Sequence, residues 1–321
     1  GWGVFASGDY QSTNKHFSLK AGVRLDGCNY SLEMQRFWKT LSPRLQLGYI
    51  FSESWSVNAN AGVYYQLPPY TALGYKADGE YVNKDLTYMR VMEASAGVKW
   101  SREMGSQSRI LLSLEGFYKA MDHIREYKGY RIFPPIENWE RTFAEGKGRA
   151  YGMETSLVYN TVSTHAALNY TLSWSERFFE DLYPEWFPDR LDNRHRLNVS
   201  VSHRFSKRFE MYAGWNWHSG DRFTVESQYL PSDDLFSYAY LFTSPNNVKM
   251  PDYHRLDVGF NFHKTTKRGN ESVWNLSVYN LYCRMNPIVV YTYSEYGKPV
   301  SAAAGMVPII PTFSYTLKFK R

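Results

Sequence analysis

The stretch Ile309-Ile310-Pro311-Thr312-Phe313-Ser314-Tyr315-Thr316-Leu317-Lys318-Phe319, close to the end of the chain, decides the fold. Every second residue from Ile309 to Phe319 is apolar or aromatic, whereas the residues between them from Thr312 to Lys318 are polar. This alternation puts one face of a strand in an apolar medium and the other in water. A tilted strand of about eleven residues crosses the hydrocarbon core of a bilayer. The pattern favours a strand of an outer-membrane β-barrel, with an edge strand of a soluble β-sandwich as the alternative.

The composition supports the membrane interpretation. Aromatic residues make up 17% of the 321 residues, yet the mean hydropathy is −0.50. This combination suits strands that are apolar on one face and wet on the other, with Tyr and Trp at the membrane interfaces. No stretch approaches 18 consecutive apolar residues, so the sequence predicts no transmembrane helix.

Charge and cysteine content exclude other classes of protein. The 37 basic and 31 acidic residues, a net charge of +6, are spread along the chain without a long run of one sign. This distribution argues against a nucleic-acid partner. Cys28 and Cys283 form neither a disulfide framework nor a zinc-binding spacing. We expect two isolated thiols, with a Cys28–Cys283 pair as the alternative.

Alternating segments recur throughout the chain. We count about thirteen, each near the ~10-residue length of a membrane strand. The first, Gly1–Tyr10, is weak. The others are Phe17–Leu25, Leu45–Phe51, Trp55–Tyr65, Met92–Trp100, Ile110–Ala120, Gly152–Asn160, Ala166–Trp174, Leu197–Phe205, Phe209–Trp217, Leu256–Phe262, Trp274–Val278 and Ile309–Phe319.

The connections fall into two sets that alternate along the chain. Outer-membrane barrels have short periplasmic turns and long extracellular loops, whereas a soluble sandwich has no reason to sort its loops by length. The short turns lie near Ser12–Lys15, Ser52–Ser54, Ser101–Gln107, Thr161–Ser163, Ser206–Lys207 and Lys264–Asn270. The long loops lie near Asp26–Leu41, Gln66–Tyr88, Met121–Lys147, Ser175–Asn193, Ser219–Pro251 and Ser294–Val307. The sequence therefore predicts a transmembrane antiparallel β-barrel with extracellular long loops.

The number of strands predicts that residues 1–321 form the C-terminal part of a larger barrel. The last strand descends from a long loop, which makes the C-terminus periplasmic, and the first segment descends from the same side. Bacterial barrels have an even number of strands, and an open sheet in lipid would leave two edges unsatisfied. Gly1–Tyr10 does not resemble a signal peptide, so the N-terminus is either processed or the start of a fragment.

Seven short motifs occur in order along the chain and together indicate a family. They are Ala21–Asp26 ("aGvRyD"), Ser42–Leu45 ("SPR"), Tyr64–Pro68 ("YyQ.P"), Gly152–Glu154 ("GiE"), Asp192–Leu197 ("D.RHrl"), Val278–Pro287 ("vyNlynr.Np") and the closing strand from Pro308 to Phe319. With these motifs the chain resembles the C-terminal barrel half of TonB-dependent outer-membrane receptors, particularly the Bacteroidota type. Two departures are the absence of any counterpart to the family's plug and TonB-contacting box, and the extension Lys320–Arg321 beyond the last aromatic.

The resemblance implies a barrel of about 22 strands around a plugged lumen. On that count roughly nine strands and the plug precede the first segment. The family further implies that ligand binding rearranges the plug, and that periplasmic TonB, energised with ExbB and ExbD by the inner-membrane proton gradient, pulls the plug open. The barrel lies among the lipids of the outer membrane.

The sequence contains no catalytic signature. It has no metalloprotease, serine-hydrolase or phosphate-loop motif, and its eight His are dispersed without ligand spacing. We therefore predict no catalytic residue, no metal and no cofactor. Charged side chains with inward parity are expected to form a lattice of salt bridges or a surface that guides substrate; they are Glu115, Glu154, Glu210, Asp257, Arg109, Lys119, Arg196, Arg204 and Arg255.

The extracellular ends are the predicted binding region because aromatic residues are dense there. Exposed aromatics stack on sugars and apolar ligands or dock a partner, and the alternative is that they pack on one another to order the loops. The predicted substrate-binding residues are Tyr64, Gln66, Tyr70, Trp186, Tyr229 and Arg255.

The first functional hypothesis is a TonB-dependent receptor that binds a nutrient outside and imports it into the periplasm. The substrate is an unknown small molecule, glycan or peptide. The second hypothesis is a structural or interaction barrel, a subunit of a surface complex with a lipoprotein partner. A barrel enzyme would need a His with a Ser or carboxylate at one level of neighbouring strands, and we find no convincing set.

Overall fold

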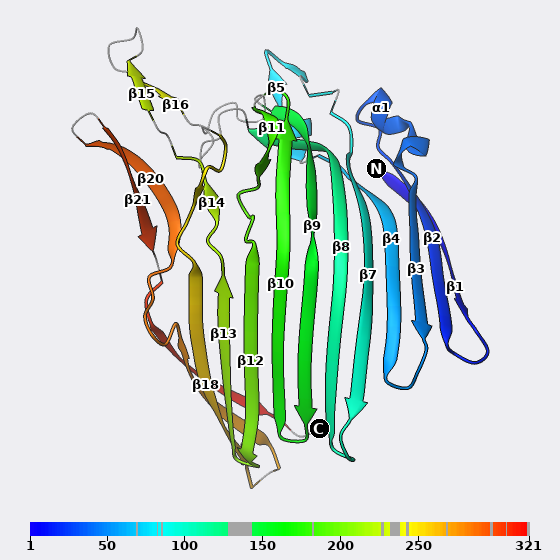
Figure 1. Ribbon diagram of the computed structural model, residues 1–321, viewed down its shortest axis with the longest axis vertical. Coiled ribbons are helices and arrows are strands. Elements are labelled where there is room, and N and C mark those ends of the chain that lie inside the picture. Colours follow the sequence, from blue (N-terminus) through cyan, green and yellow to red (C-terminus); the bar gives the residue numbers. More distant parts are fainter. Residues whose placement is uncertain are drawn as a thin grey trace.

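The computed structural model of the chain describes residues 1–68, 70–81, 83–84, 86–127, 143–181, 183–225, 228–231, 238–241, 244–267, 269–295, 298–305 and 307–319. Strands dominate these residues, as Figure 1 shows. None of the helices in the described residues is long and apolar enough to cross a membrane. The helices are α1 (Leu32–Gln35), η1 (Phe37–Thr40, a 3-10 helix) and α2 (Tyr70–Leu73). The long strands are β1 (Trp2–Gln11), β2 (Phe17–Gly27), β3 (Ser42–Ile50), β4 (Trp55–Gln66), β7 (Met89–Glu103), β8 (Ser108–Tyr127), β9 (Phe143–Thr161), β10 (Thr164–Phe179), β12 (His195–Ser206), β13 (Phe209–His218), β18 (Tyr253–Thr265), β19 (Glu271–Tyr279) and β22 (Ile310–Lys318). The short strands are β5 (Lys76–Ala77), β6 (Glu80–Tyr81), β11 (Tyr183–Pro188), β14 (Arg222–Phe223), β15 (Gln228–Pro231), β16 (Tyr238–Leu241), β17 (Val248–Lys249), β20 (Pro287–Glu295) and β21 (Lys298–Gly305).

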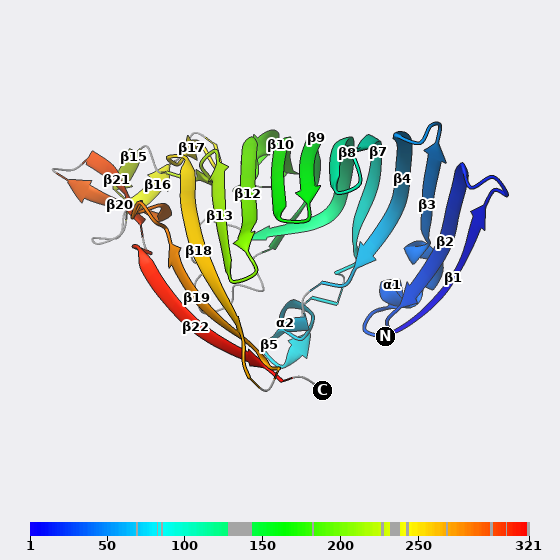
Figure 2. The same cartoon turned by 90° about the horizontal axis from the view of Figure 1, so that it is seen from below.

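The long strands form one antiparallel path in the order β1-β2-β3-β4-β7-β8-β9-β10-β12-β13-β18-β19-β22, and β11 joins β10 to complete a 14-stranded sheet. Figure 2 shows the sheet bent into an open arc, with β1 at one end and β22 at the other. Because direction alternates along a path of odd length, β1 and β22 run the same way. The prediction of about thirteen antiparallel barrel strands is confirmed.

The two faces of the sheet differ in chemistry. On β8 the apolar residues Leu112 and Leu114 are 38% and 39% exposed, whereas Ser113 and Glu115, which alternate with them, are half-buried. Side chains on the inside of a curved sheet crowd one another, so the apolar set lies on the convex face. The register pairs apolar with apolar positions across the sheet, for example Leu112 with Leu157. The convex face is therefore apolar, and the concave face is polar.

The apolar part of the convex face ends at an aromatic stack toward the long loops. The rings of Tyr118, Tyr151 and Trp174 lie on β8, β9 and β10, with centroids 6.3 Å and 5.4 Å apart. At the next convex position Arg149 Nε donates to Glu176 Oε2 at 2.6 Å. Below this ion pair β9 and β10 each offer about ten residues of tilted strand, a height of about 25 Å, which matches the apolar band of outer-membrane barrels.

A second ion pair lies one convex position farther along on the neighbouring strands, and a second aromatic belt lies at the opposite end of the sheet. Arg90 Nη2 on β7 donates to Asp122 Oδ2 on β8 at 2.5 Å. Aromatic pairs with centroids 4.9–6.4 Å apart gather near the short turns. These pairs are Trp55–Trp100, Phe209–Phe262 and Trp274–Tyr315. The convex face is thus an apolar band between two aromatic belts.

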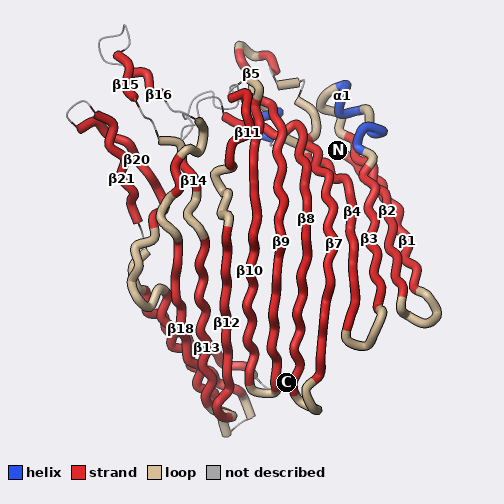
Figure 3. Tube along the Cα trace, in the orientation of Figure 1, coloured by secondary structure: helices blue, strands red, loops and turns tan. Residues whose placement is uncertain are grey.

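The connections are sorted by length between the two ends of the sheet, as the sequence predicts (Figure 3). The short turns are closed by local hydrogen bonds. Phe17 N donates to Ser12 Oγ at 3.0 Å, and Thr164 N donates to Thr161 Oγ1 at 2.8 Å. We call the opposite end the rim. It is formed by the described parts of residues 28–41, 67–88, 180–194, 219–252 and 280–309, together with the strand ends at 64–66, 121–127, 143–147 and 175–179.

The predicted extents of the long loops are wrong in three places. β8 and β9 continue to Tyr127 and from Phe143, well into the loop predicted at Met121–Lys147. β11 pairs with the end of β10, and β20 pairs with β21. Beyond the apolar band both faces of a strand are wet, so alternation disappears from the sequence while backbone pairing continues. Cys28 and Cys283 are free thiols, which confirms the expectation of two isolated cysteines.

Candidate functional site

The rim is ordered by three small apolar clusters, each of which joins separate segments. The clusters are Cys28, Met34, Leu73 and Tyr88; Ile124, Phe179 and Phe187; and Phe223, Met250 and Val290. Because each cluster buries side chains that lie far apart in the sequence, the rim is a packed structure at one end of the polar concave face. This packing also accounts for part of the aromatic density that the sequence shows in the loops.

The first cluster contains the buried phenol of Tyr88, and Tyr30 packs against it. The hydroxyl of Tyr30 donates to Leu73 O, which links residues 28–41 to residues 67–88. Tyr88 is 6% exposed, and its hydroxyl has no hydrogen-bond partner among the described residues. Burial raises the pKa of Tyr88 to about 12, with smaller contributions from the Cys28 thiol and the Asp26 carboxylate.

The Asp192–Leu197 motif is an anchor for the rim. The Asp192 side chain is almost fully buried, and its Oδ1 accepts a hydrogen bond from Ser175 N at 3.0 Å. Its Oδ2 lies 3.1 Å from Arg194 Nη2 and 3.5 Å from Arg222 Nε. One buried carboxylate therefore joins β10, the start of β12 and β14.

The Val278–Pro287 motif is a second anchor. Asn280 is 1% exposed, and its Nδ2 donates to Arg284 O and Val307 O, both at 2.9 Å. Its backbone lies in the left-handed region, with φ +54°. Asn286 is also buried, accepting from His254 N at 3.1 Å and donating to His254 O at 3.0 Å. These two amides close the loop between β19 and β22.

The concave face carries charged side chains, most of which pair with neighbours on the same wall. An exception is Glu115, which lies opposite Glu154 in register and accepts a hydrogen bond from Asn58 Nδ2 at 3.3 Å. No ion pair to either glutamate exists among the described residues. The pairs that do form on this face include Lys119–Glu93 at 3.1 Å, Arg204–Glu210 at 3.3 Å and Arg255–Asp257 at 2.9 Å.

Three of the predicted binding residues lie close together in the chain at one part of the rim. Tyr64 is on the concave face of β4, and the Arg44 guanidinium carbon is 4.7 Å from the centroid of its ring. Gln66 is the last residue of β4, and Tyr70 begins α2 with 78% of its surface exposed. This group supplies a phenol, an amide and an exposed ring.

The other three predicted residues lie on different strands, so the structure does not bring all six into one site. Trp186 on β11 is 40% exposed, and the Arg149 guanidinium lies 4.3 Å from its ring centroid. Arg255 on β18 is occupied, since its Nη1 donates to Tyr253 Oη at 3.0 Å and its other nitrogens bond to Asp257. Tyr229 lies on β15, and its side chain is outside the described part of the structure.

Sequence reasoning missed Arg44 as a partner of Tyr64. Arg44 lies directly opposite Gly62 in the pairing of β3 with β4. A signal was present, because Arg44 shares the polar parity of Gln46 and follows the Ser42–Pro43 strand start. The register between β3 and β4, which decides the contact, cannot be read from either strand alone.

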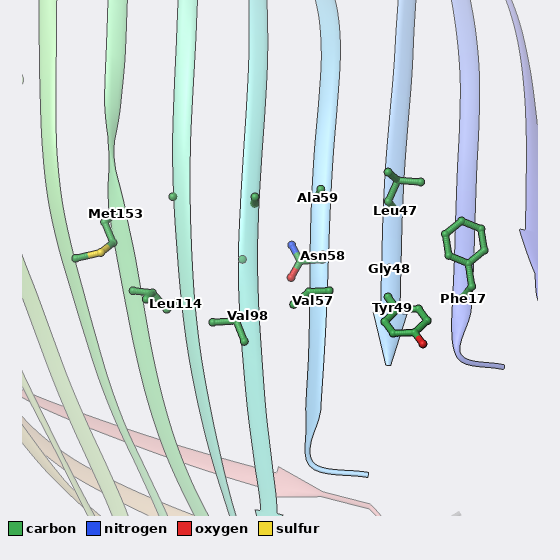
Figure 4. A pocket seen from close by; sticks show the side chains of 13 residues that line it. Phe17, Leu47, Gly48, Tyr49, Val57, Asn58, Ala59, Val98, Leu114 and Met153 are labelled. Atoms are coloured by element: carbon green, nitrogen blue, oxygen red, sulfur yellow. The ribbon is translucent and has the colours of Figure 1, made fainter. Parts of the chain in front are cut away.

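The convex face has a groove of about 770 Å³ over β2 to β9 (Figure 4). Its floor is made by small residues, including Ala59, Ala96 and Gly116, and its sides by larger ones such as Leu47 and Met153. Because the lining is almost entirely apolar and lies within the apolar band, the groove suits acyl chains rather than a polar substrate. In the described residues, no three His, Cys, Asp or Glu side chains gather in a way that could hold a metal ion.

The chain matches the family described as "TonB dependent receptor-like, beta-barrel" over residues 1–281. No curated protein matches it. Among 94 solved chains with a similar fold, the FrpB iron transporter from Neisseria meningitidis is 13% identical, with a TM-score of 0.58 over 98% of this chain and 44% of that one. The pyoverdine outer-membrane receptor FpvA from Pseudomonas aeruginosa is 15% identical, with a TM-score of 0.62 over 99% and 42%.

A third similar structure is the ferric-catecholate import receptor Fiu from Escherichia coli. It is 15% identical, with a TM-score of 0.59 over 98% of this chain and 44% of that chain. At these identities the likeness shows the fold alone. The chain spans less than half the length of each of the three structures.

Proposed function

The chain belongs to the TonB-dependent receptor-like β-barrel family, and on that premise we propose that it is part of an outer-membrane receptor that imports a nutrient. The rim and the concave wall bind the nutrient, and energy transmitted by TonB drives its passage into the periplasm. The observation that carries the proposal is the family match over residues 1–281 of a sheet with an apolar band and loops sorted by length. No covalent chemistry is assigned to the wall.

The orientation follows from the sorted connections. In outer-membrane barrels the short turns are periplasmic and the long loops are extracellular. The rim is accordingly extracellular, and β22 ends on the periplasmic side. The aromatic stack of Tyr118, Tyr151 and Trp174 then lies at the outer interface, where amphipathic rings are favoured.

The receptor includes strands beyond the thirteen of the antiparallel path, together with a plug. Since β1 and β22 run in the same direction, only an odd number of additional antiparallel strands closes the barrel. A total of about 22 strands requires nine. The added strands satisfy both free edges, which an open sheet in hydrocarbon would leave unpaired. The coverage of less than half of each related structure fits this arrangement.

The partners of this receptor are TonB, ExbB and ExbD, which it engages through the plug. The outer membrane holds no ATP, so energy must reach the receptor across the periplasm. The similar structures include iron and pyoverdine receptors, but the substrate assigned to this chain is a small molecule, glycan or peptide without further restriction. The resemblance to the Bacteroidota type stays a prediction.

The test is uptake by cells that carry the intact receptor. Labelled ferric siderophores, cobalamin, glycans and peptides are supplied to wild-type, receptor-deleted and TonB-deficient strains. We expect one class to enter only when both the receptor and TonB are present. Equal uptake of every class in all three strains would contradict the proposal. The intact mass of the receptor from purified outer membranes, expected to be about twice the mass of this chain or more, checks the additional strands and plug.

A second candidate function is an interaction subunit with a surface lipoprotein. It is favoured by the hairpin of β20 and β21, where Ile288, Tyr291 and Tyr293 are 44–51% exposed. Apolar surface on a rim element is a feature of protein-docking sites. A lipoprotein that co-purifies in a one-to-one ratio, and is lost when Tyr291 and Tyr293 are changed to Ser, would support this function. Its absence from purified receptor would contradict it.

A further inference from the structure

The concave wall has a recess of about 570 Å³ on β1 to β8, toward the rim. Its lining mixes cations, amides and two glutamates with the rings of Phe5 and Tyr64. Glu93 is paired with Lys119 at 3.1 Å, and Glu115 accepts a hydrogen bond from Asn58. The side chains that matter here are Lys20, Arg24, Arg44, Gln46, Asn60 and Tyr64. The recess therefore differs from the convex groove, whose lining is apolar.

The ring of Tyr64 lies flat along the wall because Gly62 has no side chain. A Cβ added at Gly62 would lie 2.8 Å from Tyr64 Oη and 2.9 Å from Cε2, so the ring occupies the space above this glycine. Arg44 is the cross-strand partner of Gly62, and its guanidinium rests on the same ring at 4.7 Å. Gly62, Tyr64 and Arg44 thus form one stack of backbone, phenol and guanidinium.

Arg44 is the unpaired cation of this recess. Arg24 Nη2 lies 2.7 Å from Asp26 Oδ1, and Lys20 Nζ lies 3.4 Å from Asp9 Oδ1. Arg44 has no hydrogen bond or ion pair to any of the described residues, and its side chain is exposed. The Tyr64 hydroxyl is likewise without a hydrogen-bond partner among them.

This arrangement suits an anion. A guanidinium offers its N–H groups in a planar fork that matches the two oxygens of a carboxylate or phosphate. Stacking on an aromatic ring occupies one face of the guanidinium but leaves the edge with its N–H groups open. It also restricts the side chain before a ligand arrives, which reduces the entropy lost on binding.

We propose that Arg44, stacked on Tyr64 over Gly62, binds the carboxylate or phosphate group of the ligand as it enters from the rim. The guanidinium donates to two oxygens of the anion, and the Tyr64 hydroxyl donates a further hydrogen bond. The proposal rests on the proposed import function and deepens it, because it restricts the substrate class to molecules that carry such an anionic group.

The test is arginine modification of the full-length receptor in lipid nanodiscs. Phenylglyoxal modifies accessible guanidinium groups, and peptide mass spectrometry gives the rate at each arginine. We expect Arg44 to react about tenfold faster than Arg24, whose guanidinium is tied to Asp26. Benzoate or inorganic phosphate should slow Arg44 and leave Arg24 unchanged, with half-protection at roughly 1–10 mM. Protection by benzoate alone identifies a carboxylate site, and protection by phosphate alone identifies a phosphate site.

Two variants test the stack itself. Gly62→Ala displaces the Tyr64 ring, so we expect protection of Arg44 to need about three- to tenfold more anion. Gly214→Ala is the matched control, because Gly214 is also on the concave face and a Cβ there meets no atom within 4 Å. Protection in Gly214→Ala should equal that of the wild type.

Two results would overturn the proposal. One is an Arg44 that does not react in the full-length receptor without added anion, because an acidic group elsewhere in the receptor already covers it. The other is an Arg44 that reacts but is protected by neither anion. The assay requires no transport, so failure of uptake with intact protection refutes import alone, and loss of protection with intact uptake refutes this subsite alone.

Discussion

The two ends of the sheet are stabilised by different kinds of contact, local at the short turns and long-range at the rim. At the short-turn end a serine or threonine hydroxyl accepts a hydrogen bond from an amide a few residues away, as Ser12 does from Phe17. At the rim, buried polar groups such as Asp192 join segments up to tens of residues apart, and apolar clusters bury the rest. The comparison teaches that each turn depends on contacts within a few residues, whereas each part of the rim depends on the pairing of the separate segments that it joins.

The largest expected effect comes from the rim cluster around Phe179. This side chain is fully buried against Ile124 and Phe187. Phe179→Ala should destabilise the rim by about 3–5 kcal/mol, because it leaves a cavity. Phe313→Ala, at a convex position 56% exposed, should cost about 1 kcal/mol, because acyl chains fill the space. Hydrogen exchange of β11 and of β22 in the two variants measures these losses, and equal losses would remove the distinction between rim and wall.

A new positive charge on one or the other face of β8 should have the next largest effect on stability. Leu114→Arg puts a charge at the middle of the convex band and should destabilise the barrel by about 2–4 kcal/mol in lipid vesicles. Ser113→Arg, one residue away on the concave face, should cost about 1 kcal/mol or less. Urea unfolding midpoints of the full-length receptor compare the two. The reverse order would exchange the lipid-facing and lumen-facing assignments.

Asn280 tests how far a single anchor determines the order of the rim. Asn280→Ala leaves Arg284 O and Val307 O without their donor and forces alanine into the left-handed region. We expect a local loss of about 2–3 kcal/mol. Asn280→Gly should recover about 1 kcal/mol of this loss, since glycine adopts the same backbone without strain. Limited proteolysis of residues 281–309 ranks the three proteins, and identical cleavage rates would show that the side chain is dispensable.

The smallest expected effect is at Tyr88. Its pKa rises from 10.0 to about 12 on folding. Above pH 10 the Tyr88 hydroxyl therefore loses its proton in the unfolded rim before it does so in the folded rim, and the stability of the folded rim falls as the pH rises. At pH 11 the loss should be on the order of 1 kcal/mol. Tyr88→Phe should abolish this dependence and leave stability at pH 7 unchanged or slightly higher, because the hydroxyl has no hydrogen-bond partner in the described part of the chain. Hydrogen exchange of β7 between pH 9 and 11 would detect the difference.

The wall was predictable from sequence because its signal is local. Alternation between Trp55 and Tyr65 needs no knowledge of any other strand, and the observed β4 is Trp55–Gln66. The same holds for the closing strand, predicted at Ile309–Phe319 and observed at Ile310–Lys318. Each strand carries its own alternation of apolar and polar residues, because one of its faces meets lipid and the other meets water.

The rim and the candidate site were less predictable because their contacts are long-range. Tyr64 could be chosen from its place at a strand exit, but its stacking with Arg44 depends on the register between β3 and β4. Arg255 was chosen for its inward parity, yet Asp257 and two tyrosine hydroxyls occupy its guanidinium. Parity gives the face of a side chain and says nothing about its partners.

The ion pairs that end the convex apolar face also set the bilayer thickness that this wall accepts. Arg149–Glu176 lies directly beyond the aromatic stack, and Arg90–Asp122 lies one convex position farther along the neighbouring strands. In a thicker membrane these charges would be drawn into hydrocarbon, so the surrounding lipids must thin instead, at a cost of a fraction of a kcal/mol for each ångström of mismatch. Four charges fixed to a hydrogen-bonded sheet cannot adjust one at a time. The wall is therefore matched to a thin bilayer, and the height of its rim above the lipid surface is set by these side chains.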